Sequence, residues 1–153
     1  MKRLFCAVLT LLLLACLFPQ QTLAAEMSPA GEAIVYFEDG SYMVTTIEEI
    51  GTRASGTKTQ SKARTYYGSD DEAKWKIILT GTFTYNGTSA TCTNSICSVD
   101  VYASNWYVVS KSAEKSGNEA SCTVTMGQTF LGITISKPVH TLTITCDKDG
   151  NLT

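Results

Sequence analysis

The sequence predicts an all-β fold, an antiparallel β-sandwich that is immunoglobulin-like in general architecture, with about seven strands preceded by an N-terminal hairpin arm. Two observations predict it. Apolar and polar side chains alternate over most of the chain after residue 65, and turn-prone residues separate the alternating runs. The 153 residues, 44% of them hydrophobic and 17% charged, suit one compact domain. After residue 24 no segment keeps a helical period.

The first 24 residues have the pattern of a secretion signal. Lys2 and Arg3 form a basic start, an apolar run follows from Leu4 to Phe18, and small residues precede a predicted cleavage between Ala24 and Ala25. The run is shorter than the roughly 18–20 residues that a membrane-spanning helix needs, which disfavours the alternative of a retained anchor. We therefore expect a secreted, extracellular protein.

A minor alternative is a lipoprotein. The stretch from Leu13 to Cys16 resembles a bacterial lipobox, in which Cys16 would be lipidated. Leu17 and Phe18 continue the apolar run, however, whereas lipoproteins usually turn polar at this point. Cleavage after Ala24 remains the favoured prediction.

The charge of the mature chain limits its partners. Removing Lys2 and Arg3 leaves ten basic and 14 acidic residues, so the formal charge changes from −2 to −4. This balance argues against nucleic acid or an anionic membrane as the main partner. After signal cleavage we expect no membrane association and no cofactor.

Residues 25–64 are predicted to form an acidic hairpin arm and a linker, and residues 65–153 a disulfide-tied sandwich. Two β-prone runs, Ala33–Phe37 and Tyr42–Ile47, flank Asp39 and Gly40, which is a hairpin signal. An isolated hairpin is marginal in water, so this one must either dock on the main domain or remain a mobile arm. The stretch from Gly51 to Ala63 is predicted to be a loop or linker.

The clearest strand of the predicted sandwich runs from Lys74 to Tyr85. Trp75, Ile77 and Phe83 share one parity while lysines and threonines take the other, as expected of a half-buried strand. Shorter runs follow, at Ser89–Thr93, Cys97–Tyr102, Trp106–Lys111, Glu119–Met126, Phe130–Ser136 and Val139–Cys146. Asn94 and Ser95 are among the residues predicted to separate them. This spacing of short strands is typical of a sandwich.

Four cysteines remain after signal removal, Cys92, Cys97, Cys122 and Cys146, and all four share a parity with apolar neighbours. An even number in an exported chain predicts two disulfides. Three pairings are possible, and we favour Cys92–Cys146 with Cys97–Cys122 because the longer loop removes more entropy from the unfolded chain. Zinc is the weaker alternative, since Cys122 and Cys146 lack the close spacing of a second ligand pair.

Several turn and strand motifs of the mature chain resemble those of a known family. They are Tyr36–Tyr42, Thr65–Tyr67, Gly81–Gly87, Ser89–Thr93, Lys115–Asn118, Thr145–Asp147 and Gly150–Leu152. In these motifs the chain resembles a family of small exported proteins of unknown function from Gram-positive bacteria. The resemblance covers nearly the whole mature chain and implies a bond between Cys92 and Cys146, with Cys97 and Cys122 as additions. It implies no activity, ligand or catalytic residue.

Candidate ligand contacts come from the aromatic residues, which can stack on sugars. Trp106, Tyr107, Tyr66 and Tyr67 are the main candidates for such a platform, and Tyr36 and Tyr42 are further ones. Packing in the core or at an interface is the alternative for each of them.

Candidate catalytic groups are few. His140, the only histidine, shares a parity with Leu142 and Ile144, so packing explains it better than catalysis. The acidic clusters Asp70–Glu72 and Asp147–Asn151 could serve a hydrolase or, for the second, calcium, but solvated turns explain both. We therefore expect no catalytic residues and no metal site.

These observations favour a non-enzymatic secreted protein that binds a cell-surface polymer, a glycan or another protein. The alternative function is a secreted antibacterial or toxin-like effector, which would also be small and disulfide-tied.

Overall fold

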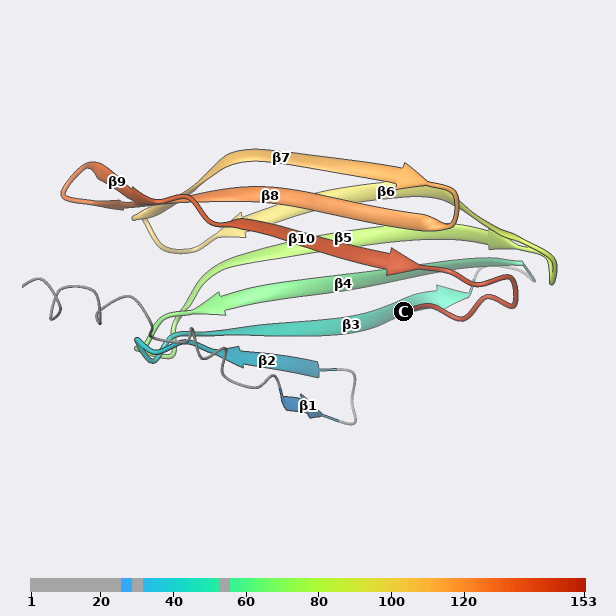
Figure 1. The fold of residues 1–153 in the computed structure, drawn as a ribbon, viewed down its shortest axis with the longest axis horizontal. Coiled ribbons are helices and arrows are strands. Elements are labelled where there is room, and N and C mark those ends of the chain that lie inside the picture. Colours follow the sequence, from blue (N-terminus) through green and yellow to red (C-terminus); the bar gives the residue numbers. More distant parts are fainter. Residues whose placement is uncertain (1–25, 29–31, 53–55) are drawn as a thin grey trace, which may run out of the picture.

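The computed structural model describes residues 26–28, 32–52 and 56–153. These residues form ten strands in two antiparallel sheets (Figure 1), so the predicted β-sandwich is confirmed, with more strands than predicted. No helix in the described ranges is long and apolar enough to cross a membrane. The predicted signal peptide and Cys16 lie outside the described residues.

The first sheet, here sheet A, is a meander of six strands in sequence order. Its strands are β1 (Glu26–Ser28), β2 (Glu32–Tyr36), β3 (Tyr42–Thr52), β4 (Thr57–Tyr67), β5 (Ala73–Tyr85) and β6 (Ala90–Val101). β-branched and aromatic residues are frequent in β3 and β5.

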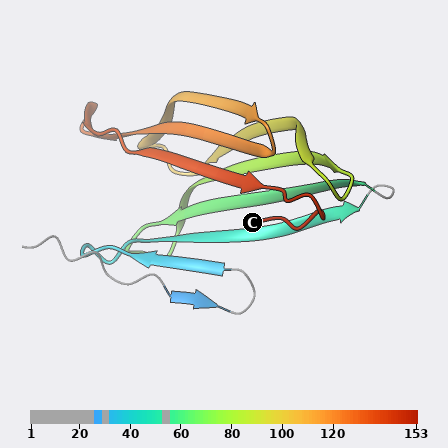
Figure 2. The same ribbon diagram turned by 45° about the vertical axis from the view of Figure 1, so that its right-hand side comes forward.

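The second sheet, sheet B, has the order β10–β8–β7, and a short strand β9 also pairs with β8. Its strands are β7 (Trp106–Ser116), β8 (Glu119–Phe130), β9 (Ile133–Ser136) and β10 (Val139–Thr145). Sheet B packs on β4, β5 and β6. In Figure 2 the strands β1 to β3 extend beyond this second layer.

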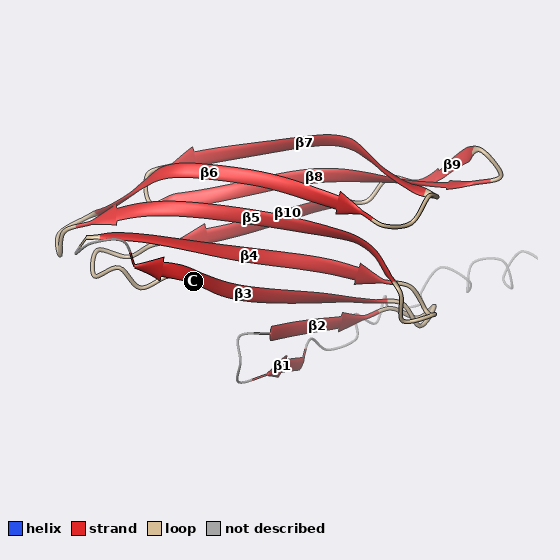
Figure 3. Cartoon of the chain, turned by 180° about the vertical axis from the view of Figure 1, so that it is seen from behind, coloured by secondary structure: helices blue, strands red, loops and turns tan. Residues whose placement is uncertain are grey.

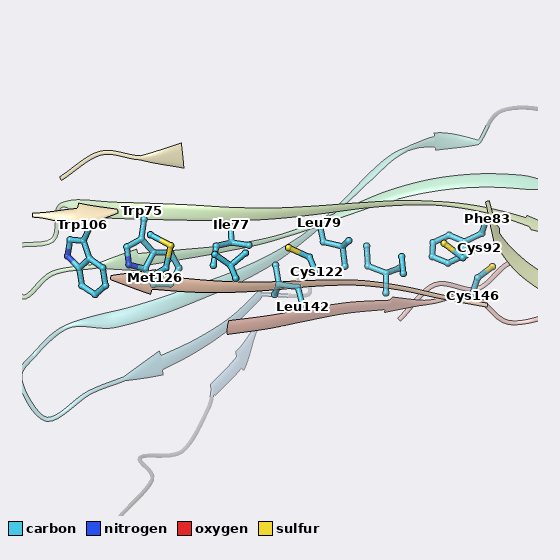
Figure 4. Close-up of a cluster of buried hydrophobic side chains, with 13 residues drawn as sticks. Trp75, Ile77, Leu79, Phe83, Cys92, Trp106, Cys122, Met126, Leu142 and Cys146 are labelled. Carbon is cyan, nitrogen blue, oxygen red and sulfur yellow. The ribbon is translucent and has the colours of Figure 1, made fainter. Parts of the chain in front are cut away.

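The core lies between β5 and β8, where side chains of one parity meet (Figure 4). Trp75, Ile77 and Leu79 on β5 are at most 1% exposed. They face buried residues of β8 such as Val124 and Met126, neither of which is exposed. The period-two pattern read from the sequence therefore places the core correctly.

The predicted hairpin is present, because β2 and β3 pair antiparallel across a turn with Gly40 at a φ of +81°. It is not a detached arm, since β3 pairs along β4. The predicted linker from Gly51 to Ala63 is wrong for its second half, which belongs to β4. Polar side chains cover both faces of β4 and give no apolar periodicity, but its backbone is paired on both sides by β3 and β5.

The predicted break at Asn94 and Ser95 is also wrong. These residues lie inside β6, and the pairing with β5 continues through a register shift opposite Thr82 and Phe83. A bulge thus replaces the turn that the polar residues suggested.

Candidate functional site

Three tyrosines form a row across the face of sheet A that points away from sheet B. Tyr36 on β2 lies opposite Tyr42 on β3, which in turn lies opposite Tyr67 on β4. The rings of Tyr42 and Tyr67 stack with centroids 4.8 Å apart, and those of Tyr36 and Tyr42 are 5.6 Å apart. The side of the row at Tyr36 is open to solvent, with Tyr36 47% exposed. We call these three residues the tyrosine ladder.

Two acidic turns lie beside the tyrosine ladder. A Cβ placed on Gly40, in the β2–β3 turn, would lie 3.4 Å from Cβ of Ser69, so this turn touches the β4–β5 turn. The second turn carries Asp70 and Asp71, both exposed, and Asp71 has a positive φ of 59°. The pKa of Tyr42 is raised, first by partial desolvation of its hydroxyl and then by the negative charge of Asp71.

The first turn carries a third carboxylate, that of Asp39. It accepts hydrogen bonds from the amide and the hydroxyl of Ser41, which lower the pKa of Asp39. In the neighbouring turn Lys74 forms an ion pair with Asp70, but the carboxylate of Asp70 remains exposed to solvent. The rim of the tyrosine ladder therefore offers ionised acceptors for hydroxyl groups.

A row of stacked tyrosines beside carboxylates has a defined binding chemistry. The rings of Tyr42 and Tyr67 cover each other's faces, so the ring of Tyr36 at the open end offers the apolar face, while phenol and carboxylate oxygens can hydrogen-bond to hydroxyls. A sugar ring has matching features, with C–H groups on its faces and hydroxyls around its edge. The same aromatic pairs also stabilise the sheet across strands.

The other candidate aromatics do not join this platform. Tyr66 stacks on Trp75 at 5.4 Å and contacts Trp106 at 5.3 Å, so it belongs to the core, as does Trp106 at 8% exposure. Tyr107 lies over Gly127 on β8, where its ring occupies the space of a side chain. Neighbouring residues of a strand face opposite ways, so the parity of Tyr66 and Tyr67 could have separated them once the core face was known.

His140 has a packing role. On β10 its ring lies 4.6 Å from that of Trp75, and its Nε2 atom is buried without a hydrogen-bond partner. Desolvation, with the nearby charge of Arg64, lowers the pKa of His140 to about 4. The imidazole is therefore neutral at pH 7.

The two acidic clusters lie at opposite ends of β5. Asp70 to Glu72 precede the strand. The backbone carbonyl of Lys148, in the second cluster, accepts a hydrogen bond from the amide of Gly87, just beyond the other end of the strand. A strand of 13 residues is about 40 Å long, and paired glycosidase carboxylates are at most about 10 Å apart. The clusters therefore cannot act as one catalytic pair.

The second cluster is organised by Asp147. Its carboxylate accepts the amides of Asp149 and Asn151 and the side-chain amide of Asn151, which lowers the pKa of Asp147. This pattern is an Asx-type turn, as solvated-turn chemistry predicts. The described part of the chain contains no group of three or more histidine, cysteine or acidic side chains arranged to hold a metal.

The cysteines agree with the predicted pairing in one case. Cys97 on β6 and Cys122 on β8 form a disulfide that joins the two sheets. The second predicted bridge is not formed in the structure, where Cys92 and Cys146 are buried free thiols. Their thiols donate to the backbone carbonyls of Asn94 and Asp147 instead, and burial raises the pKa of both.

The fold is that of an all-β protein of two antiparallel sheets, with a row of aromatic side chains on the outer face of sheet A. No family model and no curated protein matches the sequence. Among solved structures the chain is similar to a hypothetical protein from Listeria monocytogenes EGD-e. The identity is 16%, the match covers 88% of this chain and 96% of that chain, and the TM-score is 0.47.

Proposed function

We propose that this chain is a secreted, non-enzymatic binding protein that holds a cell-surface polysaccharide on the tyrosine ladder. The observation that carries the proposal is the row Tyr36–Tyr42–Tyr67, in which Tyr42 stacks on Tyr67 and Tyr36 packs at a tilt on Tyr42, open to solvent at Tyr36 and flanked by carboxylates. A non-enzymatic role is supported by the separation of the acidic clusters and by the packing of the one histidine against Trp75.

Export is supported by the predicted signal and by sulfur chemistry. The Cys97–Cys122 bond is compatible with an extracellular protein, because disulfides persist in oxidising compartments.

We extend the proposal of disulfide formation to the second pair of cysteines, Cys92 and Cys146. The amide of Cys92 donates to Gly117 O, and that of Cys146 donates to Asn118 O, so the backbones of both cysteines lie beside one turn. Figure 4 shows both side chains near Phe83. They are free thiols in the structure, and we propose that they are oxidised to a second bridge in the exported protein.

Binding to purified cell-wall polysaccharide tests the proposed function. Tyr36→Ala should weaken binding at least about fivefold, because an aromatic contact contributes about 1 kcal/mol beyond its area, and Tyr36→Ala/Tyr67→Ala should weaken it further. The measurement is isothermal titration with soluble wall fragments, or a pull-down on insoluble wall.

Tyr102→Ala is the matched control, because Tyr102 is 56% exposed and lies outside the tyrosine ladder. It should bind as the wild type does, and circular dichroism should show that all variants fold. Equal binding by the wild type and the Tyr36→Ala/Tyr67→Ala variant, or no binding to any wall fraction, would contradict the proposal that the tyrosine ladder binds sugar.

A further inference from the structure

The hairpin between β8 and β9 carries the largest group of exposed apolar side chains near one turn. Phe130, Leu131, Ile133 and Ile135 are 64%, 86%, 69% and 58% exposed, and we call them the β8–β9 tip. From Gln128 to Ser136 the chain has no charged residue. Figures 1 and 3 show this hairpin reaching past the end of the sandwich, where no strand of the described ranges covers it.

The turn of this hairpin places a leucine in an unfavourable backbone conformation. Leu131 and Gly132 have φ values of 50° and 79°, which makes a two-residue turn with both central residues left-handed. Asn or Asp followed by Gly is the favoured sequence there, whereas a leucine is strained in that conformation and exposes apolar surface. A residue that is unfavourable in the monomer points to a contact outside it.

β9 also has an open hydrogen-bonding edge. Among the described strands it pairs with β8 alone, so the backbone groups of Ile133–Ser136 on the other side have no strand partner. The edge of β10, further along the same side of sheet B, is covered. Lys62 Nζ donates to Thr143 O at 2.9 Å, and Arg64 donates to Thr141 O at 3.5 Å. Basic side chains thus block pairing at β10 and leave β9 free.

A side-chain hydrogen bond holds β9 in place, with its open edge facing away from β8. The hydroxyl of Tyr107 lies 2.9 Å from Oγ1 of Thr134, which fixes the middle of β9 against sheet B. Ile133 and Ile135 flank Thr134 and share the opposite face. An uncharged β-prone strand with a free edge is a template for another strand.

We infer that β9 pairs antiparallel with β9 of a second copy of this chain, so that sheet B continues from one molecule into the other. A two-fold axis at Thr134 places Ile133 of each copy opposite Ile135 of the other, and the four isoleucines then form one apolar cluster. The edge is self-complementary and carries no charge that would repel its copy. A strand of four residues buries little area, so the dimer should be weak, with a dissociation constant in roughly the micromolar range.

A lipid bilayer fits the same apolar residues less well. The unpaired amides and carbonyls of β9 would lose water in hydrocarbon without gaining partners, whereas a second β9 strand satisfies them. This inference is independent of the proposed sugar site, which lies on sheet A.

Sedimentation equilibrium of the mature chain over about 1–300 μM tests the inference. The wild type should show a monomer–dimer equilibrium. Ile135→Lys should weaken it at least tenfold, because a lysine at the edge opposes pairing. Ile96→Lys is the matched control, since Ile96 is 52% exposed on β6, and it should dimerise as the wild type does.

Two further variants separate contact from folding and fix the register. Leu131→Asn improves the turn, so it should raise the melting temperature while weakening the dimer. Thr134→Cys should give a covalent dimer on oxidation with diamide, because the axis brings the two Thr134 positions together. A monomer at 300 μM, a dimer unaffected by Ile135→Lys, or a monomer that floats with phosphatidylcholine vesicles would each overturn the inference.

Discussion

Replacing Cys97 and Cys122 together by alanine should lower the free energy of unfolding by about 3–4 kcal/mol. The bond closes a loop with a sequence separation of 25, for which chain entropy alone gives about 3.5 kcal/mol. It also joins β6 of sheet A to β8 of sheet B, at a cysteine, Cys122, with no exposed surface. Urea denaturation followed by the fluorescence of the buried Trp75 and Trp106 measures the loss.

Ile96→Ala is the control for this variant. Ile96 neighbours Cys97 on the same strand but is 52% exposed, so its truncation should cost below about 1 kcal/mol. If the double alanine variant unfolded within 1 kcal/mol of the wild type, the disulfide would not be a main constraint between the sheets.

Stability should fall by about 2 kcal/mol between pH 7.5 and pH 5 because of His140. Its folded pKa is about 4 and its unfolded value 6.5, so the neutral form is the one that folding favours. The contribution is fully present above pH 6.5 and is lost as the pH falls from 6.5 toward 4, where the unfolded chain takes up a proton that the buried ring resists. Urea midpoints measured at several pH values follow this loss.

His140→Phe keeps an aromatic ring against Trp75 and removes the titration. Its stability should change little between pH 7.5 and pH 5. The stabilisation from carboxylates with a lowered pKa, including Asp39 and Asp147, is fully present throughout this window, and it is lost only as the pH falls below their unfolded value of 3.8. A wild-type protein as stable at pH 5 as at pH 7.5 would contradict the burial of a neutral His140.

Alternation along β5 was enough to predict its buried face, and the parity of the cysteines with apolar neighbours on their own strands predicted their inward direction, because a half-buried strand records its environment at every second residue. The same logic failed at β4. Gln60, Lys62 and Arg64 face the inner side of that strand, where Lys62 and Arg64 reach the carbonyls of β10. A strand whose inner face carries long polar side chains looks like a linker in sequence.

The tyrosine ladder was predictable only in part. Its three members were among the aromatic candidates. That they lie side by side depends on the register of β2, β3 and β4, which hydrogen bonding between the strands decides. Tyr66 and Trp106 do not belong to the ladder because β4 and β7 place them in the core. The open edge of β9 is a property of sheet order, which single-strand patterns do not encode.

The most direct test of the account is mass spectrometry of the protein recovered from the medium of a secreting host, with disulfides left intact. The account predicts a chain that begins at Ala25 and carries two linked peptide pairs, Cys97 with Cys122 and Cys92 with Cys146. A chain that keeps residues 1–24, a lipid on Cys16, or four free thiols after export would contradict it.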